Sequence, residues 1–444
     1  MRKRSAALTA AAATVACTMA LSACSGGAHG SGGSGGTAAA PSDPGTVSGD
    51  ITVLTHKTDL AADGTLARYA AEFTKIYPNV HVKFEPVVDY EGDVKIRLNS
   101  DDYGDVLMIP AAVPVADYPK FFAPLGTQAD LGQKYRFIDK GTYNGQVYGI
   151  AINGNATGMV YNKAVWQQAG VTSWPTTPDQ FIADLQAIKS KTQAIPLYTI
   201  YHEGWPMTAW QAYLGEVSCD TKANDALATD PAPWAPGKEL NQIDTLLYNV
   251  VHDQLTEKDP TTTAWEGSKS QIAGGKIGTL ALASWAISQM KAAAKTSGQD
   301  PANIGFMPYP AQVGGHFCSV ISPDYLEAVS IHSAHKAAAR AWVDWFVDKS
   351  TYAQDQALLP TLKTGAMPAE LKAYQDAGVQ FIELSQDKNA LVSKIDNQSE
   401  IGLNKPDYRQ HIVDLARGAG SGSLDGYFAA LNKKWADAIK TVGS

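Results

Sequence analysis

The sequence predicts an α/β protein of two domains. From residue 50 onward, apolar segments of strand length alternate with amphipathic segments of helix length. Residues 50–444 form a part of roughly 400 residues, which is long enough for two ordinary domains. Hydrophobic residues make up 45% of the chain and charged residues 18%, a balance that is typical of globular proteins.

The alternation is clearest in the first part of the folded chain. We expect strands at 50–54 (DITVL), 80–88 (VHVKFEPVV) and 105–109 (DVLMI), with helices at 66–76 and 89–99 between them. A helix that links two neighbouring parallel strands makes a right-handed crossover. The pattern therefore predicts an α/β sheet with right-handed crossovers.

The rest of the chain contains the same kinds of segment. A helix begins at Pro178 with Thr177 as its N-cap, because threonine accepts a backbone hydrogen bond there and proline fits the first helical position. Residues 276–283 (KIGTLALA) read as a buried strand, and residues 220–236 as a surface loop. We expect further strands at 144–150, 159–161, 195–200 and 329–331, and further helices at 240–251, 265–273 and 336–348.

The first residues predict export from the cytoplasm. Basic residues at positions 2–4 precede an apolar stretch, residues 6–21, which is interrupted by threonines and is weak as a membrane-spanning helix. The LSAC tetrapeptide that ends at Cys24 resembles the bacterial lipobox, in which cleavage leaves the cysteine first and its thiol receives a lipid. We predict a lipoprotein signal peptide at residues 1–23 and lipidation of Cys24. The alternative is a plain signal peptide with a chance cysteine.

A linker follows the lipobox. Residues 25–49 are almost entirely glycine, serine, alanine, threonine and proline, a composition that cannot build a core and behaves as a flexible chain. We therefore predict a flexible tether at residues 24–49. Lipid, tether and folded body together predict a protein anchored to the outer face of the bacterial cytoplasmic membrane and free to reorient.

Charge, cysteines and aromatic residues narrow the function. A net charge of −8 argues against nucleic-acid binding, which needs a basic face. Outside the export region, the remaining cysteines are Cys219 and Cys318, and we expect a disulfide between them, with two separate buried thiols as the alternative. The 10 tryptophans and 19 tyrosines suit stacking on sugar rings, although any one of them can equally be a core residue.

Several segments together carry a family resemblance. They are DVLMIP (105–110), NGQVYGI (144–150), VYNKAVWQQAG (160–170), WPTTPDQF (174–181), GKIGTLALASWA (275–286), IGFMPYP (304–310) and HKAAARAWVDWFVD (335–348). In this order, behind a lipobox and a tether, they resemble the extracellular solute-binding proteins of ABC importers, in the branch that includes maltose-binding protein and other oligosaccharide binders. The resemblance spans most of residues 51–442.

The resemblance implies a type II periplasmic-binding-protein-like fold, with two α/β lobes joined by a multi-crossing hinge. It places the N-lobe at 50–155 and 309–352 and the C-lobe at 156–308 and 353–444. In this family a sugar or oligosaccharide lies in the interlobe cleft, the lobes close on it, and the loaded form is delivered to the transmembrane permease subunits of the importer. It implies a monomer that carries out no chemistry and needs no cofactor or metal.

The resemblance also implies binding residues. The loop after the first strand, the segment before Tyr161, the loop after the strand at 195–200 and the Ser-Trp-Ala turn supply ligand contacts in the family. At these positions stand His56, Lys57, Asp59, Asn153, Asn155, Tyr201, Glu203, Trp205 and Trp285. The stretch after Asp105 reads MIPAAVPVADY and lacks the aromatic and charged cluster of maltose binders, which argues against a maltose-like specificity.

Other readings remain open for these residues and for the chain. Lys57 and Asp59 also fit a solvated loop, the two asparagines fit turns that shape the hinge, and each tryptophan fits core packing. The alternatives for the whole protein are capture of a different solute and, less favoured, a secreted glycan hydrolase. The one Gly-x-Ser-x-Gly match, GGSGG at 32–36, lies in the predicted tether and not between a strand and a helix, so it is no nucleophile elbow. The chain has no dense histidine tract, and His332 and His335 read as surface residues.

Overall fold

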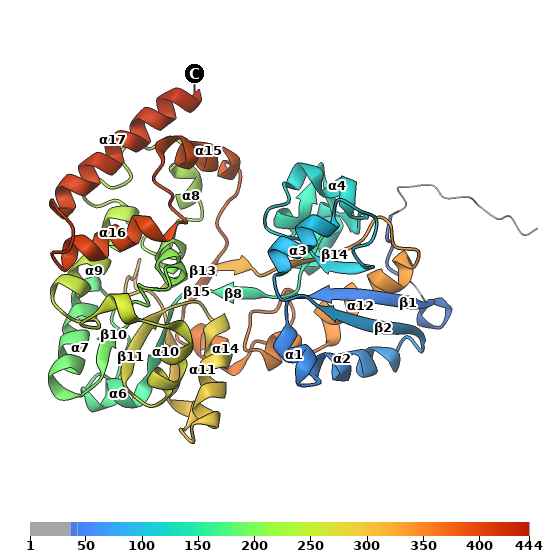
Figure 1. Ribbon diagram of the computed structural model, residues 1–444, viewed down its shortest axis with the longest axis horizontal. Helices are drawn as coiled ribbons and strands as arrows, with labels where there is room; N and C mark the ends of the chain where they lie inside the picture. The colour runs from blue at the N-terminus through green and yellow to red at the C-terminus, as the bar shows by residue number, and fades with distance from the viewer. Residues whose placement is uncertain (1–36, 42, 444) are drawn as a thin grey trace, which may run out of the picture. The chain divides into compact units, whose positions relative to one another are not determined.

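The computed structural model describes residues 37–41 and 43–443, and Figure 1 shows its elements in chain order. The predicted signal peptide and the lipidation site Cys24 lie outside the described residues. The model has two α/β lobes, as the sequence predicts. We call the lobe that holds β1 the N-lobe and the lobe that holds β9 the C-lobe. No helix in the described part of the chain is long and apolar enough to cross a membrane.

The N-lobe is built on a five-stranded sheet with the order β2-β1-β3-β14-β7. β1 pairs in parallel with β2 and β3, whereas β14 runs antiparallel to both β3 and β7. The strands are β1 (Ser48–Thr55), β2 (Asn79–Pro86), β3 (Val106–Met108), β14 (Leu326–Val329) and β7 (Ile150–Ala151). The parallel part contains the strands expected at 50–54, 80–88 and 105–109.

Helices such as α2 and α12 pack on this sheet through an apolar face. In α2 the side chains of Leu66, Tyr69 and Phe73 are buried, as the helical spacing predicts. The helices of this lobe are α1 (Thr58–Ala62), α2 (Thr65–Thr74), α3 (Tyr90–Arg97), α4 (Tyr118–Phe121), α5 (Gln128–Lys134), α12 (Lys336–Lys349) and α13 (Tyr352–Asp355). A small antiparallel sheet joins β4 (Gly126–Thr127), β6 (Gln146–Val147) and β5 (Thr142–Tyr143).

The C-lobe is built on a four-stranded sheet with the order β10-β11-β9-β12. β10 and β11 are parallel, and β9 is antiparallel to both β11 and β12. The strands are β10 (Ile195–Leu197), β11 (Ile277–Ala281), β9 (Met159–Asn162) and β12 (Ile304–Met307). β10 is shorter than the strand expected at 195–200, and Ile200 has a φ of 55°, which ends an extended run.

Ten α-helices belong to the C-lobe in the described part of the chain, and α15, α16 and α17 lie together in the red part of Figure 1. They are α6 (Lys163–Gln168), α7 (Pro178–Lys191), α8 (Ala223–Ala226), α9 (Glu239–His252), α10 (Trp265–Ala273), α11 (Trp285–Thr296), α14 (Ala369–Asp376), α15 (Asn389–Ser399), α16 (Pro406–Ala416) and α17 (Leu424–Gly443). The predicted cap of α7 is present, since Thr177 accepts from the Gln180 N–H. The segment 220–236 is not simply a surface loop, because it holds α8 and the buried Trp234.

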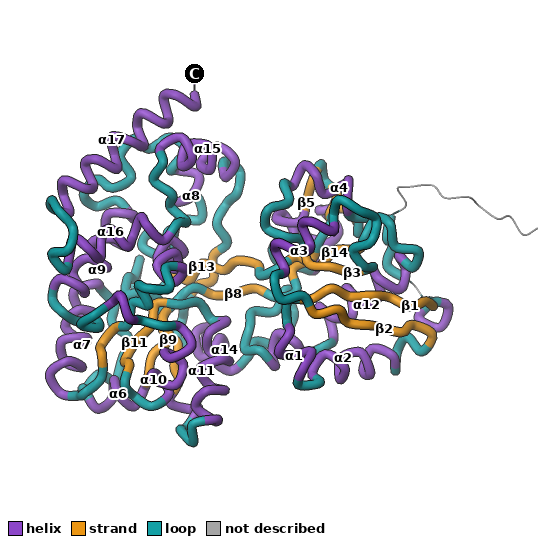
Figure 2. Tube along the Cα trace, in the orientation of Figure 1, coloured by secondary structure: helices purple, strands orange, loops and turns teal. Residues whose placement is uncertain are grey.

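A third sheet links the two lobes. β13 (Cys318–Pro323) pairs antiparallel with β8 (Gly154–Ala156) and parallel with β15 (Gln380–Ile382), and Figure 2 shows β8 and β13 side by side. The residues at which the chain passes from one lobe to the other stay a prediction, but two contacts help to locate these crossings. Tyr309 is buried with residues of the C-lobe core, and Leu359 pairs with Gly154. We propose that the chain crosses within β8, within β13 and shortly before α14.

The end of the predicted tether packs on the N-lobe. Ala38 is buried, its N–H donates to the Pro124 carbonyl at 3.0 Å, and its carbonyl accepts from the buried Arg340 at 2.9 Å. β1 begins at Ser48, and Val47 before it is also buried. Residues 38 and 47–49 are therefore part of the folded N-lobe, where composition alone indicated a flexible chain. Composition misses these contacts because they are made mainly by the backbone.

Candidate functional site

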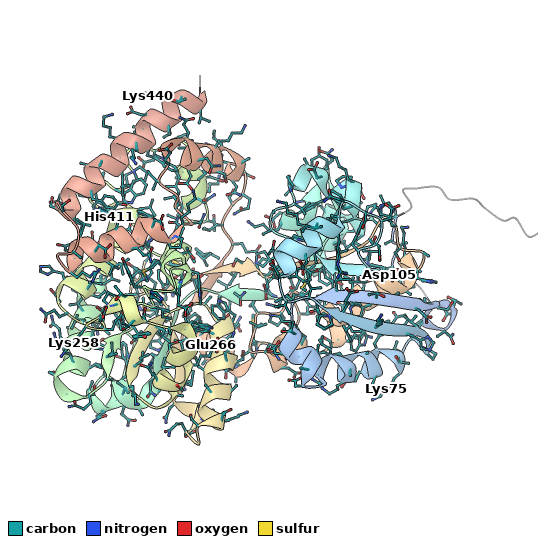
Figure 3. All side chains as sticks on the ribbon, in the orientation of Figure 1. Lys75, Asp105, Lys258, Glu266, His411 and Lys440 are labelled. Carbon is teal, nitrogen blue, oxygen red and sulfur yellow. A yellow bond between two sulfur atoms is a disulfide. The ribbon has the colours of Figure 1, made fainter. Side chains whose placement is uncertain are left out.

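Three tryptophans form an aromatic wall on the C-lobe. The ring centroid of Trp205 lies 5.4 Å from that of Trp265 and 5.8 Å from that of Trp285, and Trp265 and Trp285 are 5.4 Å apart. The planes of the three pairs meet at 47° to 79°, so the rings touch by edges and tilted faces. Figure 3 labels Glu266, the residue that follows Trp265 in α10.

A cavity of about 390 Å³ lies against this wall, within the size range of small-ligand pockets. Two of the three tryptophans line it, and small side chains keep it open. Its lining residues are Thr157, Gly158, Trp205, Thr208, Ala209, Ala212, Tyr213, Leu282, Ala283 and Trp285. The cavity can therefore offer flat aromatic faces, apolar contacts and a few hydroxyl groups to a ligand.

Each tryptophan of the wall stands at the start of a helix. Trp205 begins the 3₁₀ helix η4 (Trp205–Tyr213) after Gly204, whose φ of 76° suits glycine. Trp265 begins α10, and its N–H donates to a carboxylate oxygen of Glu203 at 3.1 Å. Trp285 begins α11 after the buried Ser284, whose hydroxyl accepts from the Ala156 N–H at 3.0 Å. The Glu203 carboxylate thus contacts the wall through the backbone N–H of Trp265.

A second candidate site lies in the N-lobe, at the carboxyl end of β1. We call this site the polar face. His56 follows β1, and its Nδ1 lies 3.2 Å from the sulfur of Met108 at the end of β3. Its ring also contacts Tyr325 at 4.7 Å and Tyr90 at 6.0 Å between centroids. The Tyr325 hydroxyl in turn donates to Glu91 at 2.7 Å. The ends of parallel strands commonly gather such side chains at one edge.

The His56 imidazole is neutral at physiological pH. Burial and, second, the neighbouring Lys57 ammonium lower the pKa of His56 to about 4, although the carboxylates of Asp324 and Asp59 oppose them. A neutral imidazole carries one donor and one acceptor nitrogen, so it can pair with either role of a ligand hydroxyl.

Lys57 and Asp59 lie beside His56 at the rim of the polar face. Within the described residues, neither the Lys57 ammonium nor the Asp59 carboxylate makes a hydrogen bond or an ion pair. Lys57 is half-buried and Asp59 is exposed. Both charged groups are therefore available to a ligand, and both also remain consistent with a solvated loop.

The two asparagines stand where the chain leaves the N-lobe sheet. Asn153 is fully buried and donates weakly to Asp324 at 3.5 Å, whereas Asn155 is half-buried on β8. The side-chain oxygen of each is buried and accepts no hydrogen bond within the described structure. Asn153 is therefore placed to shape the crossing, and Asn155, two residues before Thr157, does not itself line the cavity.

Tyr201 is directed away from the cavity. Its hydroxyl donates to both carboxylate oxygens of Asp414 on α16, at 3.0 Å each. Of the C-lobe residues expected from the sequence, Trp205 and Trp285 line the cavity and Glu203 supports the wall, but Tyr201 does not line it. The sequence gives no sign of this pairing, because Asp414 lies 213 residues away.

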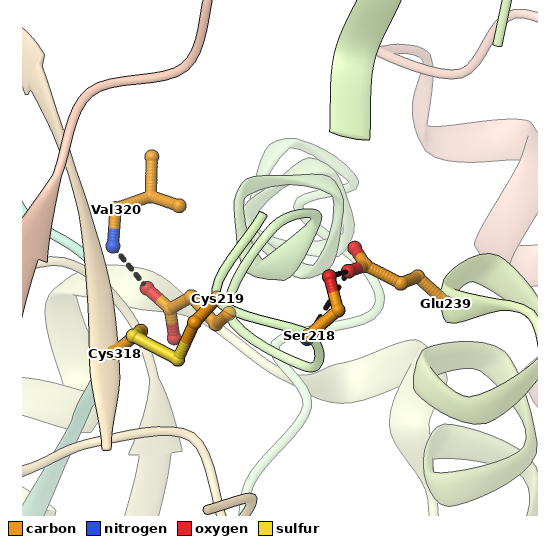
Figure 4. Close-up of a disulfide and its surroundings, with 6 residues drawn as sticks. Ser218, Cys219, Glu239, Cys318 and Val320 are labelled. Atoms are coloured by element: carbon orange, nitrogen blue, oxygen red, sulfur yellow. Dashed lines mark hydrogen bonds between the residues drawn. A yellow bond between two sulfur atoms is a disulfide. The ribbon is translucent and has the colours of Figure 1, made fainter. Parts of the chain in front are cut away.

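Cys219 and Cys318, the pair expected from the cysteine count, are joined by a disulfide that fastens the segment after η4 to β13 (Figure 4). The same segment reaches β13 a second time, because the buried carboxylate of Glu216 accepts from the Val320 N–H at 2.7 Å. Burial raises the pKa of Glu216 well above its usual range.

Sequence reasoning missed Trp265, Tyr90 and Tyr325. Trp265 was expected only as the start of a helix, and the two tyrosines carried no motif. A search for aromatic residues at the beginnings of helices would have added Trp265. No group of three or more histidine, cysteine or acidic side chains in the described part of the chain is arranged to hold a metal ion.

Comparisons with known proteins define the class. Residues 57–353 match the family model for bacterial extracellular solute-binding proteins, and the chain belongs to this family. It therefore acts outside the cytoplasm.

Among solved structures, the chain is similar to BlMnBP2 of Bifidobacterium animalis, a manno-oligosaccharide-specific solute-binding protein in complex with mannotriose. The two sequences are 30% identical, the TM-score is 0.78, and the match covers 89% of this chain and 95% of BlMnBP2. BlMnBP1 of the same organism, an ABC transporter binding protein in complex with mannobiose, is 32% identical with a TM-score of 0.78, covering 90% and 96%. The multiple sugar-binding protein of Streptococcus mutans is 25% identical over 64% of this chain and 68% of its own length.

Proposed function

We propose that the protein is a lipid-anchored receptor that captures an oligosaccharide and delivers it to an ABC import permease. The observation that carries the proposal is the tryptophan wall beside a ligand-sized cavity. Sugar rings present C–H groups that pack on aromatic faces, while their hydroxyls need a few well-placed polar groups. The related proteins named above, which bind manno-oligosaccharides or several sugars, support the same ligand class.

The two candidate sites are proposed to act on one ligand from opposite lobes. The wall would bind sugar faces, and His56, Lys57, Asp59 and Asn155 would hydrogen-bond hydroxyls when the lobes close. Closure of this kind is a hinge motion that the ligand drives through extra contacts in the closed state. The protein is proposed to work as a monomer, without catalysis and without a cofactor.

The anchor is proposed from Cys24. Cleavage before this residue would leave a cysteine that carries two acyl chains, which suffices for stable membrane binding. A tether then keeps the receptor close to its permease and raises its effective concentration there. Metabolic labelling of the full chain with a fatty-acid analogue tests the anchor: label is expected on the unchanged protein and none on Cys24→Ala, and equal labelling of both would refute it.

Ligand capture is tested by titrating the chain from Ser25 onward with mannobiose, mannotriose, raffinose, maltose and diacetylchitobiose. Tryptophan fluorescence and melting temperature report binding, and chromatography of the sugar reports cleavage. At a ligand concentration of 100 times Kd, binding adds about 2.7 kcal/mol of stability. A clear stabilisation by one or more intact sugars is the expected result. No response to any sugar would favour a different solute, and sugar cleavage would favour the hydrolase.

A further inference from the structure

The turn before Trp205 is fastened to helix α16. The Tyr201 hydroxyl donates to both oxygens of Asp414, and the Tyr201 carbonyl accepts from the side-chain amide of Gln410 at 2.8 Å. The same carbonyl accepts from the N–H of Gly204, the residue that precedes Trp205. The turn at residues 201–204 is thus held at its side chain and its backbone by one helix.

Two further contacts join α16 to the segment that carries Trp205. A Cβ on Gly204 would lie 3.2 Å from the Pro406 ring, so the turn lies directly against the first residue of α16. Arg409 on α16 donates to the side chain of Gln211 in η4 at 3.0 Å, and its own charge is paired with Asp244, both fully buried. α16 is therefore a rigid support for both ends of the turn and for η4.

Trp205 depends on this support because few contacts of its own orient it. Its side chain is 36% exposed, and within the described residues its indole N–H donates no hydrogen bond. Its ring is placed by contacts with Trp265 and Trp285 and by the backbone of the turn. A shift of the turn therefore moves the ring relative to the cavity.

We propose that Tyr201 and Asp414 form a latch that positions Trp205 for ligand stacking. This inference rests on the proposed function and assigns Tyr201 a role beside the site. Asp414 also pairs with Arg417 at 3.0 Å, which keeps its carboxylate oriented toward the turn. All three side chains are partly exposed, so the latch can be altered without opening the core.

The decisive variant is Tyr201→Phe, which removes one hydroxyl. We expect Kd for the best sugar to rise about 3- to 10-fold, because a hydrogen bond to a charged group is lost and the ring position is no longer fixed. The melting temperature should change by no more than about 2 °C. The near-ultraviolet circular dichroism should change, since it reports the relative orientation of the tryptophans. Tyr143→Phe is the matched control, because Tyr143 is a half-buried tyrosine on β5 of the N-lobe and its hydroxyl makes no hydrogen bond within the described residues.

Two more variants distinguish a loss of the Trp205 ring position from a general loss of sugar affinity. Asp414→Asn keeps an acceptor for the Tyr201 hydroxyl and should retain most of the affinity that Asp414→Leu loses. In a Trp205→Ala background, Tyr201→Phe should have no further effect on Kd. An unchanged Kd and spectrum for Tyr201→Phe, or an equal loss in both backgrounds, would overturn the inference. If the unchanged protein binds no sugar, the proposed function fails, and the spectrum alone still decides whether the latch orients Trp205.

Discussion

The polar face of the N-lobe and the aromatic wall of the C-lobe differ in how their side chains are held. On the polar face, His56 and Tyr325 are in contact and Tyr325 donates to Glu91, whereas the charged ends of Lys57 and Asp59 have no partner among the described residues. On the wall, Trp205 and Trp285 are held by ring contacts and by the backbone turns before them. The wall is thus suited to bind by buried area, and the polar face to discriminate among hydroxyl patterns.

The two sites also differ in the interactions of the segments that lie behind them. The segment behind the wall is fastened to β13 by the Cys219–Cys318 disulfide, and no disulfide stands in the N-lobe within the described residues. Behind the polar face the N-lobe instead buries Glu327 on β14, with one carboxylate oxygen 3.4 Å from the Trp342 N–H and the other unpartnered. The segment behind the wall should therefore respond to redox conditions, and each lobe buries a carboxyl that should respond to pH, Glu327 in the N-lobe and Glu216 in the C-lobe.

The largest expected effect is that of the disulfide. Its cysteines are 99 residues apart, and closing a loop of about 100 residues stabilises a protein by about 4.7 kcal/mol in the chain-entropy model. The Cys219→Ser, Cys318→Ser double variant should lose stability of this order in guanidinium unfolding of the chain from Ser25 onward. A midpoint equal to that of the unchanged protein would show that the wall needs no covalent support. The unchanged protein with reductant is the matched control.

The next effect is that of Trp285→Ala on affinity. Loss of a large aromatic surface from the cavity should cost about 2 to 3 kcal/mol, which raises Kd about 30- to 150-fold. Isothermal titration with the best sugar measures it. Trp285→Phe keeps a stacking face and should recover much of the loss. A Kd within 3-fold of the unchanged protein would remove Trp285 from the ligand site.

The sequence predicted the parts of these regions that depend on local pattern. Strand and helix periodicity gave the parallel strands β1, β2 and β3, and the Thr177-Pro178 pair gave the start of α7. The family resemblance led to Trp205 and Trp285, which line the cavity. It did not reveal Trp265, whose partners in the wall lie 60 and 20 residues away in the chain. Nor did it reveal the Tyr201–Asp414 pair, because only tertiary packing joins two such distant residues.

Glu327 should make the N-lobe sensitive to alkaline pH. Burial raises its pKa from 4.5 to about 8, so its protonated form is favoured in the folded state. The stability that this proton provides is complete below about pH 4.5 and is lost as pH rises through about 8. Glu327→Gln cannot ionise, so at pH 9 it should unfold at a higher temperature than the unchanged protein, and its melting temperature should depend less on pH between pH 5 and 9.

The control for this profile is Glu266→Gln, because the Glu266 side chain is 79% exposed and, in the described part of the chain, pairs with Lys269 alone. It should leave the pH dependence of the melting temperature unchanged. If Glu327→Gln follows the same curve as the unchanged protein, the Glu327 carboxyl does not account for the pH dependence of stability.

The smallest expected effect is that of Lys57→Ala. This variant tests how much the polar face contributes to affinity. The ammonium is half-buried and unpaired, so it can donate to a sugar hydroxyl, but water competes for it in the open protein. We expect Kd to rise about 2- to 5-fold, with no loss of melting temperature, and we expect no change from Lys95→Ala, an exposed lysine on α3. If Lys57→Ala weakens binding more than Trp285→Ala does, affinity comes mainly from the polar face, and the division of roles between the two lobes is reversed.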